Sequence, residues 1–262
     1  MPPAGTDILS TAMRIYLSLL CLMACTTVPG TGRTQFNLFP LSEDVRLGEV
    51  AWKSTLESEN VLPVSSPEHQ RVDRIMQRLV AATQQRHPSL AESFDWEWRV
   101  IQDDSQVNAW CLPGGKMAVY TGMINFVTSD DQLAAVMGHE IAHAVARHGT
   151  ERLSQTQAAQ VVLAATDGEL NDQEMRMAES AFGLGVALPF SRAHEHEADE
   201  LGIYIAAAAG YEPKAAIDLW RAMEQETGRT PEFLSTHPSP STRAAKLTAL
   251  LPTAERIRDR NE

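Results

Sequence analysis

Two histidines, His139 and His143, lie four residues apart, with Glu140 directly after the first. On a helix this spacing places both imidazoles on one face, where they can bind a single Zn²⁺ ion. Glu140 is then in position to act as a general base towards an attacking water. The pattern predicts a zinc site that hydrolyses peptide bonds. The alternative is a pair of core histidines hydrogen-bonded to the backbone, because the pattern also arises by chance.

The residues around this pattern predict a buried helix. Ser129 and Gln132 form a capping box, and two aspartates between them are favourable in a first helical turn. Residues 133–145 are almost all apolar apart from the two histidines and Glu140, which indicates burial on most sides. Polar groups in such surroundings need partners, and one metal ion satisfies both imidazoles. Gly149 is expected to end the helix.

A catalytic zinc ion usually takes three protein ligands and keeps one position open, so a third ligand must lie elsewhere in the chain. One group of zincins has a third histidine close behind the second, but Ala146 and Gly149 occupy the corresponding positions here. His148 is one residue out of register. Near a helix end, a histidine more often complements the helix dipole than binds metal.

A second helical segment downstream offers carboxylates. Glu195 and Asp199 are four residues apart and share one face, so one can bind the metal while the other holds the second nitrogen of a zinc-bound histidine. Glu197 falls on the opposite side of this helix. His194 and His196 point away from the ligand position, and we expect them to be solvated or to lie at the edge of the cleft.

The two motifs together resemble those of the gluzincin peptidases that include bacterial BepA, LoiP and HtpX and the eukaryotic CAAX prenyl proteases. The resemblance rests on His139-Glu140-x-x-His143 and, further along, Ser191-Arg192-x-x-Glu195-x-Glu197-Ala198-Asp199-x-x-Gly202. It implies that Glu195 is the third zinc ligand and Asp199 the partner that orients a ligand histidine. It also implies a zincin-type fold with one Zn²⁺ per chain.

Residues 108–122 read as a hairpin of two short strands around a Pro-Gly-Gly turn. An ordinary surface hairpin is the interpretation from the residues alone. The resemblance implies instead an edge strand that lines the cleft, with Asn108, Ala109 and Trp110 as substrate-binding residues. Such an edge can hold an extended peptide by main-chain hydrogen bonds.

A loop with two prolines contains His237 and leads to Arg243 at the start of an amphipathic helix. The resemblance implies that this histidine lies at the zinc, either as an extra ligand in a resting state or swung to stabilise the tetrahedral intermediate. We therefore expect His237 and Arg243 to act beside the catalytic base Glu140 as oxyanion or regulatory residues.

The N-terminus contains a short apolar stretch after Arg14 that is too short to span a bilayer but fits a secretory signal, with Met1 or Met13 as the start. Leu22 and Ala24 before Cys25 resemble the lipobox of bacterial lipoproteins, in which the cysteine is acylated. Lipidation at Cys25 would anchor the chain to a membrane. Thr26 after the cysteine, rather than Asp, resembles the pattern sorted to the outer membrane of Gram-negative bacteria, so we expect the chain at the periplasmic face of that membrane. The alternative is a plain cleaved signal with a free cysteine.

Composition places the rest of the chain among globular proteins. The formal net charge is −12, which makes nucleic acid an unsuitable partner, and 44% of the residues are hydrophobic, enough for one core. Cys111 is the one cysteine expected in the folded domain, so no internal disulfide is expected. Helices are expected over 44–57, 68–85, 151–165, 173–188, 191–209, 213–226 and 242–250, and a strand over 96–102.

We therefore expect an α+β fold that is mostly helical: a zincin-type metallopeptidase domain whose small β-sheet places a hairpin edge over the active-site helix. Residues 1–24 are expected to be a lipoprotein signal peptide, 25–42 the lipidated cysteine and a flexible linker, and 43–262 the catalytic domain. We do not expect the helical repeats of BepA-like proteins to follow this domain.

The predicted function is zinc-dependent endoproteolysis of unfolded, damaged or misassembled cell-envelope proteins. The first alternative is a chaperone-like binder of such proteins that rarely cleaves them; the presence of Glu140 argues against it, since a binder needs no general base. The second is a structural zinc protein. A set of two histidines and one carboxylate leaves an open position, whereas structural sites are normally closed.

Overall fold

A three-stranded sheet lies at the centre of the molecule, in the spatial order β3 (Glu97–Ile101), β5 (Lys116–Tyr120) and β4 (Ala109–Leu112). The computed structural model of the chain describes residues 25–165, 190–226, 231–237 and 242–260. β3 runs parallel to β5, whereas β4 is antiparallel to it. No described strand pairs with the outer edge of β4, so the predicted hairpin has the edge that was expected.

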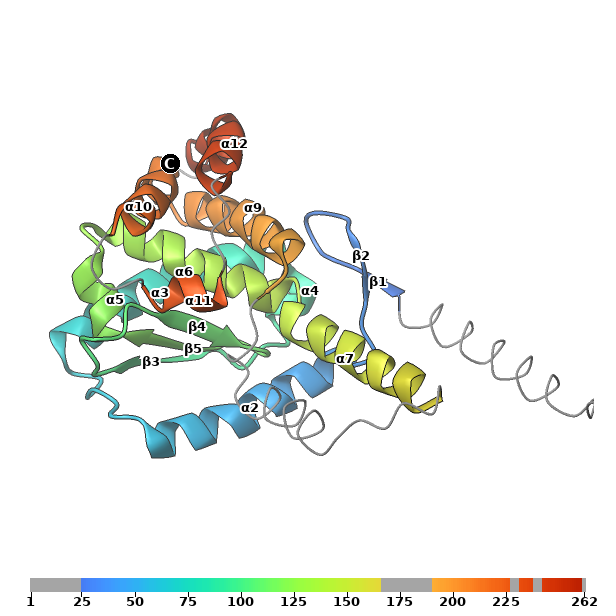
Figure 1. Cartoon of the computed structure of the whole chain (residues 1–262). Helices are drawn as coiled ribbons and strands as arrows, with labels where there is room; N and C mark the ends of the chain where they lie inside the picture. The colour runs from blue at the N-terminus through green and yellow to red at the C-terminus, as the bar shows by residue number, and fades with distance from the viewer. Residues whose placement is uncertain (1–24, 166–189, 227–230, 238–241, 261–262) are drawn as a thin grey trace, which may run out of the picture.

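The alternation of residues along these strands explains why helices cover both faces of the sheet. One face of the sheet packs in the main core with α3 and α6, and its side chains are Val100, Ala109, Met117 and Val119. The other face packs against Trp52 of α2 with Trp110, Leu112 and Ala118. Figure 1 shows α6 above the sheet and α2 below it.

Helices supply most of the remaining structure, which confirms the predicted mostly helical α+β class. They are α2 (Leu41–Ser58), α3 (Pro67–Arg86), α4 (Pro88–Ala91), α5 (Thr121–Phe126), α6 (Asp130–Val145), α7 (His148–Ala165), α9 (Arg192–Ala208), α10 (Lys214–Gln225), α11 (Phe233–Thr236) and α12 (Arg243–Arg258). The expected helix over 173–188 lies outside the described residues. None of the described helices combines the length and the apolar character needed to cross a bilayer.

Helix α6, which carries His139 and His143, begins where its cap predicts and ends earlier than expected. The side chain of Ser129 accepts a hydrogen bond from the backbone of Gln132, as in a capping box. The helix ends at Val145, and Arg147, not Gly149, takes the left-handed conformation with φ 58°. Arg147 tolerates this backbone because its guanidinium is fixed by Asp44 and by the carbonyl of Phe39.

Two glycines let α6 and α9 pack with their backbones in close contact. A Cβ on Gly202 would lie 2.9 Å from the backbone N and Cα of His139, and a Cβ on Gly138 would lie 3.0 Å from the carbonyl oxygen of Gly202. A methyl group at either position would push the helices apart. The close approach brings Glu195, two turns before Gly202, to the histidines of α6.

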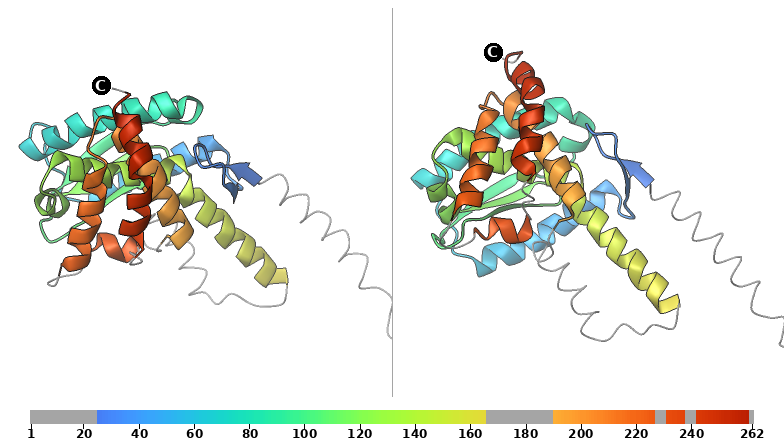
Figure 2. Two further views of the ribbon diagram at one scale, coloured as in Figure 1. Left: turned by 90° about the horizontal axis from the view of Figure 1, so that it is seen from above. Right: turned by 45° about the horizontal axis from the view of Figure 1, so that its top comes forward.

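Residues 25–42 are ordered, which differs from the flexible linker expected for them. β1 (Cys25–Thr27) and β2 (Thr34–Phe36) form an antiparallel hairpin beside α7 (Figures 1 and 2). Val28 at its turn is fully buried against α6 and α9. Polar, glycine-containing sequence suggested a spacer, but the hairpin is held by tertiary contacts that composition does not show. Cys25 is exposed at the start of the hairpin, its lipidation stays a prediction, and the expected signal at 1–24 lies outside the described residues.

The glycine contact between α6 and α9 gives a stability prediction. Gly202→Ala should lower the free energy of unfolding by about 1–3 kcal/mol, because the added methyl group has only backbone to displace. Gly149→Ala is the matched control, since its Cβ meets only ring atoms of Pro113, the closest at 3.3 Å. Denaturant titration measures both. Equal stability of Gly202→Ala and wild type would show that the helices can separate at no cost.

Candidate metal centre

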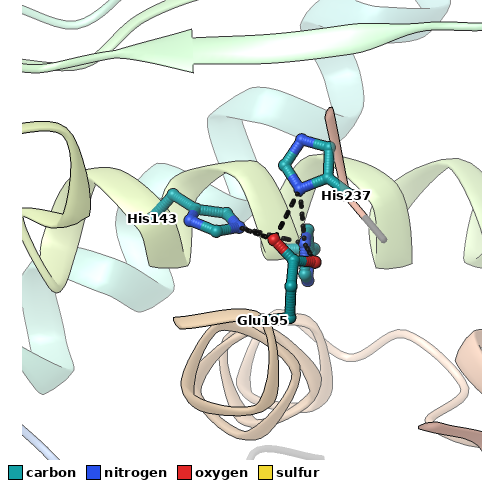
Figure 3. A group of neighbouring side chains, drawn as sticks. His143, Glu195 and His237 are labelled. Carbon is teal, nitrogen blue, oxygen red and sulfur yellow. Dashed lines mark hydrogen bonds and ion pairs between the residues drawn. The ribbon is translucent and has the colours of Figure 1, made fainter. Parts of the chain in front are cut away.

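Four side chains from three separate segments converge on one point. His139 and His143 come from α6, Glu195 from the first turn of α9, and His237 from the residue after α11. Figure 3 shows how His143, Glu195 and His237 point toward one another. The Nε2 atoms of the two α6 histidines are 3.1 Å apart, and Nδ1 of His237 lies 3.3 Å from Nε2 of His139. Glu195 places Oε1 3.1 Å from Nδ1 of His237 and 3.5 Å from Nε2 of His143.

This arrangement fits a bound cation. All four side chains are at most 3% exposed, so water does not solvate their polar atoms. The ring nitrogens of the three histidines face one another. A hydrogen bond between two of these nitrogens uses one proton, so the remaining nitrogen lone pairs have no donor and are available to a cation. Ligands about 2.1 Å from a tetrahedral ion are roughly 3.4 Å from one another, close to the distances observed. The described residues can therefore hold a metal ion of the kind that prefers imidazole and carboxylate.

Glu140 lies beside this cluster but is not one of the four. Its Oε1 atom is buried with no hydrogen-bond partner and is 3.4 Å from Nε2 of His237. Burial raises the pKa of Glu140, although the neighbouring His237 and His139 oppose that shift. The carboxylate also accepts a backbone hydrogen bond from Cys111, which ties it to β4. Because Oε1 accepts no hydrogen bond from the described residues, it is free to take a proton from a molecule that enters the site.

Asp199 lies on the far side of His139 from the cluster. Its Oδ1 is 3.2 Å from Nδ1 of His139, as expected for a residue that orients a ligand histidine. Burial works against ionisation of Asp199, but the charge of Arg243 and the bond to His139 lower its pKa. Burial likewise disfavours charge on His139, yet its bonds to Asp199 and Glu195 raise the pKa of His139 to about 9.

Arg243 occupies a different place from the one expected of an oxyanion group. It is fully buried, and its guanidinium donates to both oxygens of Asp199 and, over 2.8 Å, to Oε2 of Glu195. The guanidinium also lies over the ring of Trp220, 3.4 Å from the ring centroid. Arg243 therefore fixes the carboxylates of Asp199 and Glu195 in place by hydrogen bonds. A loop residue at the start of a helix gave no sign of this in the sequence.

The three residues expected to bind substrate are buried. Ala109 has no exposed surface, Trp110 packs edge-on against Trp52, and the side-chain oxygen of Asn108 accepts from the backbone of Ala109. Their side chains are thus taken up by the fold. What remains for an extended peptide is the main chain along the outer edge of β4.

A second cluster behind His143 was missed in the sequence. His148 is fully buried, places Nδ1 2.9 Å from Nδ1 of His143, and places Nε2 2.9 Å from Glu197. His194 stacks on His148 and lies 3.2 Å from Glu151, so the expectation that His194 is solvated is wrong. The start of α7 covers the start of α9 here, and no local pattern shows that contact.

The environment keeps His148 neutral. Desolvation lowers the pKa of His148 to about 4, because its hydrogen bond to Glu197 offsets only part of the effect of burial. A neutral imidazole has one donor and one acceptor nitrogen. His196, by contrast, is half-buried and lies outside both clusters, as expected for a histidine that does not bind the metal.

The buried position of Arg243 predicts its effect on stability. Arg243→Met should lower the free energy of unfolding of the metal-free chain by about 3–5 kcal/mol, because Asp199 and Glu195 lose the charge that compensates their burial. Arg258→Met on the same helix breaks a more exposed pair with Glu212 and should cost at most about 1 kcal/mol. Denaturant titration compares the two, and similar losses would contradict the structural role of Arg243.

Comparison with known proteins supports the catalytic interpretation. A model of peptidase family M48 matches residues 66–251. The mitochondrial metalloendopeptidase OMA1 of Schizosaccharomyces pombe is 35% identical over 90% of this chain and 69% of its own length. OMA1 of Saccharomyces cerevisiae is 29% identical over 97% of this chain and 79% of its own. The β-barrel assembly-enhancing protease of Escherichia coli is 27% identical, over 55% of this chain and 32% of its own.

These relatives correct the expected location and refine the expected family branch. The relatives that match most of the chain are named as mitochondrial, which contradicts a place at the outer membrane of a Gram-negative bacterium. A short apolar stretch near an N-terminus does not by itself distinguish the targeting signals of different compartments. The resemblance to the bacterial branch is confirmed only as a shared family, without support for a small lipoprotein group.

The matched region includes α6, α9 and the start of α12, and with them His139, Glu140, His143, Glu195, Asp199, His237 and Arg243. The chain belongs to peptidase family M48 and is a metalloendopeptidase.

Proposed function

We propose that the chain is a zinc-dependent endopeptidase that cleaves extended segments of unfolded or damaged proteins. The observation that supports this most directly is the buried, unpartnered Oε1 of Glu140 beside a ligand set of His139, His143 and Glu195. Two imidazoles and one carboxylate are a set that zinc takes in hydrolytic sites. The wording of the relatives' names, metalloendopeptidase, agrees with the reaction.

The residues divide the work of hydrolysis between them. His139, His143 and Glu195 would hold the zinc ion, which would supply Lewis acidity for the attack of water on a peptide carbonyl. Glu140 accepts the proton of the attacking water and later delivers it to the departing amine, a role suited to a carboxylate whose pKa is raised by burial. Asp199 and Arg243 keep His139 and Glu195 in place during the reaction.

The substrate backbone is proposed to lie along β4. This strand is an outer one, and the backbone of Cys111 within it reaches Glu140. A peptide added as a further strand would present its carbonyl groups beside the general base. Recognition by main-chain hydrogen bonds requires an extended chain and reads little sequence. Unfolded segments meet that requirement, whereas helices and folded sheets do not.

His237 is proposed to regulate access to the metal. His237 is the fourth member of the cluster, and its ring stacks on Phe233 with the ring centroids 4.4 Å apart. It would fill the coordination position that a catalytic zinc site keeps open for water or substrate. With a metal ion bound, His237 would have to move away before hydrolysis, and its imidazole could then stabilise the tetrahedral intermediate. Under this proposal, the cluster of four side chains is the resting state of the enzyme.

The first test is cleavage of unfolded casein by the wild-type chain and by Glu140→Gln. The variant should lose at least about 100-fold in rate, because it has no general base, yet keep one zinc ion per chain. Glu57→Gln, an exposed change on α2, is the control and should cleave at the wild-type rate. Zinc content is measured for each protein by elemental analysis.

Three outcomes of that test are distinct. Cleavage by wild type and by the control but not by Glu140→Gln supports the proposal. Equal cleavage by all three proteins removes Glu140 from the reaction. Zinc in every sample without cleavage in any would favour the chaperone-like alternative, in which the site binds unfolded segments and does not hydrolyse them.

The pKa of His139 gives a prediction for metal affinity. A protonated His139 cannot bind metal, so with a pKa of about 9 the proton competes with zinc at neutral pH. Apparent zinc affinity should rise roughly tenfold per pH unit from pH 7 to pH 9 and then level off. Competition with a chelator of known pH dependence measures it. An affinity constant over this range would show that His139 is already neutral at pH 7.

A further inference from the structure

His143 has two nitrogens, and each faces a different group. Nε2 points into the metal cluster, 3.1 Å from Nε2 of His139, while Nδ1 lies 2.9 Å from Nδ1 of His148. Among the described residues, no carboxylate or backbone carbonyl bonds to the second nitrogen of His143, although a ligand histidine normally has such a partner. The imidazole of His148 is the partner of this nitrogen instead.

Hydrogen-bond chemistry determines the protons in this contact. A neutral histidine that binds metal through Nε2 must carry its proton on Nδ1, so Nδ1 of His143 is the donor. Nδ1 of His148 must then be the acceptor, which leaves the proton of His148 on Nε2. That nitrogen is 2.9 Å from Oε2 of Glu197, an oxygen that can only accept. Every group in the chain Glu197–His148–His143 thus has the partner that metal binding requires.

Glu197 is held in turn by the N-terminal hairpin. Arg33 donates from Nε to Oε2 of Glu197 over 2.6 Å, and the hydroxyl of Thr31 donates to Oε1. The other two guanidinium nitrogens of Arg33 donate to both oxygens of Glu151 at 2.8 and 2.6 Å. Arg33 is 29% exposed, whereas both carboxylates are nearly buried. The hairpin therefore closes the cluster from outside.

We propose that His148 is a positioning residue for the metal ligand His143, and that Glu197 and the hairpin residue Arg33 fix the tautomer in which it works. The proposal rests on the proposed function in one respect, that His143 binds a metal ion. It adds a role for three residues that neither bind the metal nor touch the substrate, and it makes the N-terminal hairpin part of the support of the metal centre.

A second cation site is the main alternative, since His148, Glu151 and His194 lie close enough together to bind one. The contacts favour the positioning role. Both oxygens of Glu151 already accept from Arg33, and both nitrogens of His148 have partners. The guanidinium supplies the positive charge that a metal ion would otherwise bring, and the two cations would repel each other.

The test uses zinc affinity, measured by chelator competition on the full chain. His148→Phe keeps a ring but removes the acceptor, and it should weaken zinc binding by about 10- to 100-fold. His148→Asn restores an oxygen at the position of Nδ1 and should recover most of that loss. Arg33→Met should weaken binding by a smaller factor, and Arg46→Met, an exposed arginine paired with Glu43, should leave it unchanged.

A measurement on the wild-type chain tests the same point without any variant. In the metal-free protein labelled with ¹⁵N-histidine, NMR should show His143 protonated on Nδ1 and His148 protonated on Nε2. The opposite tautomer of His148 would overturn the proposal. This result also separates the two proposals, because it is obtained without metal and stands even if the chain proves not to bind zinc or not to cleave casein.

Two outcomes of the affinity measurement would overturn the positioning role. One is zinc affinity in His148→Phe within twofold of wild type while circular dichroism shows a folded chain. The other is two zinc ions per wild-type chain with the second lost in His148→Phe, which would establish a second cation site instead. If His148→Phe does not fold, His148→Asn, Arg33→Met and the NMR measurement decide.

Discussion

Three carboxylates and one guanidinium are buried together at the centre of this molecule, and the rest of the structure depends on how those charges are balanced. Glu140, Glu195 and Asp199 are each at most 4% exposed, and Arg243 is the cation that contacts two of them. Unpaired buried charges are costly, and Arg243 together with a protonated His139 still leaves the three carboxylates one positive charge short. A divalent ion among His139, His143 and Glu195 would supply the missing charge. Binding of such an ion would therefore also stabilise the fold.

The backbone contact between α6 and α9 determines where these charges meet. Because Gly138 and Gly202 remove two side chains from the interface, the helices approach closely enough for Glu195 to reach the histidines. The ligand set is thus a property of helix packing as well as of the His-Glu-x-x-His spacing. The same approach brings Asp199 against the outer nitrogen of His139.

Much of this arrangement could be predicted from the sequence, because its determinants are local or periodic. The cap at Ser129, the four-residue spacing of His139 and His143 and the alternation along β4 and β5 each reflect the geometry of one element. The helical spacing offered Glu195 and Asp199 as the third ligand, and the resemblance chose Glu195. The resemblance also added His237, which no local pattern indicates. Fold class and reaction class followed from these features.

The errors share a physical cause, which is dependence on contacts distant in sequence. Helix α6 ends at Val145 because Arg147 then takes a left-handed conformation. That conformation depends on the salt bridge from Arg147 to Asp44, which lies 103 positions away in the sequence. The order of the N-terminal hairpin depends on Glu151 and Glu197. Trp110 faces the core because α2 presents Trp52 to it. In each case the local residues permit several outcomes, and a partner elsewhere selects one.

Helix α9 shows how one element can serve both ligand histidines. Glu195 reaches the metal cluster, and Asp199, four residues on, orients His139 directly. Glu197 lies on the opposite side, from which it cannot reach either ligand, yet it contacts His148, whose other nitrogen reaches His143. The imidazole of His148 lies between Glu197 and His143 and connects them, because Glu197 on the opposite side of α9 cannot contact His143 directly. Both histidines of α6 are thereby oriented by carboxylates of α9, one directly and one through the buried His148 at the start of α7.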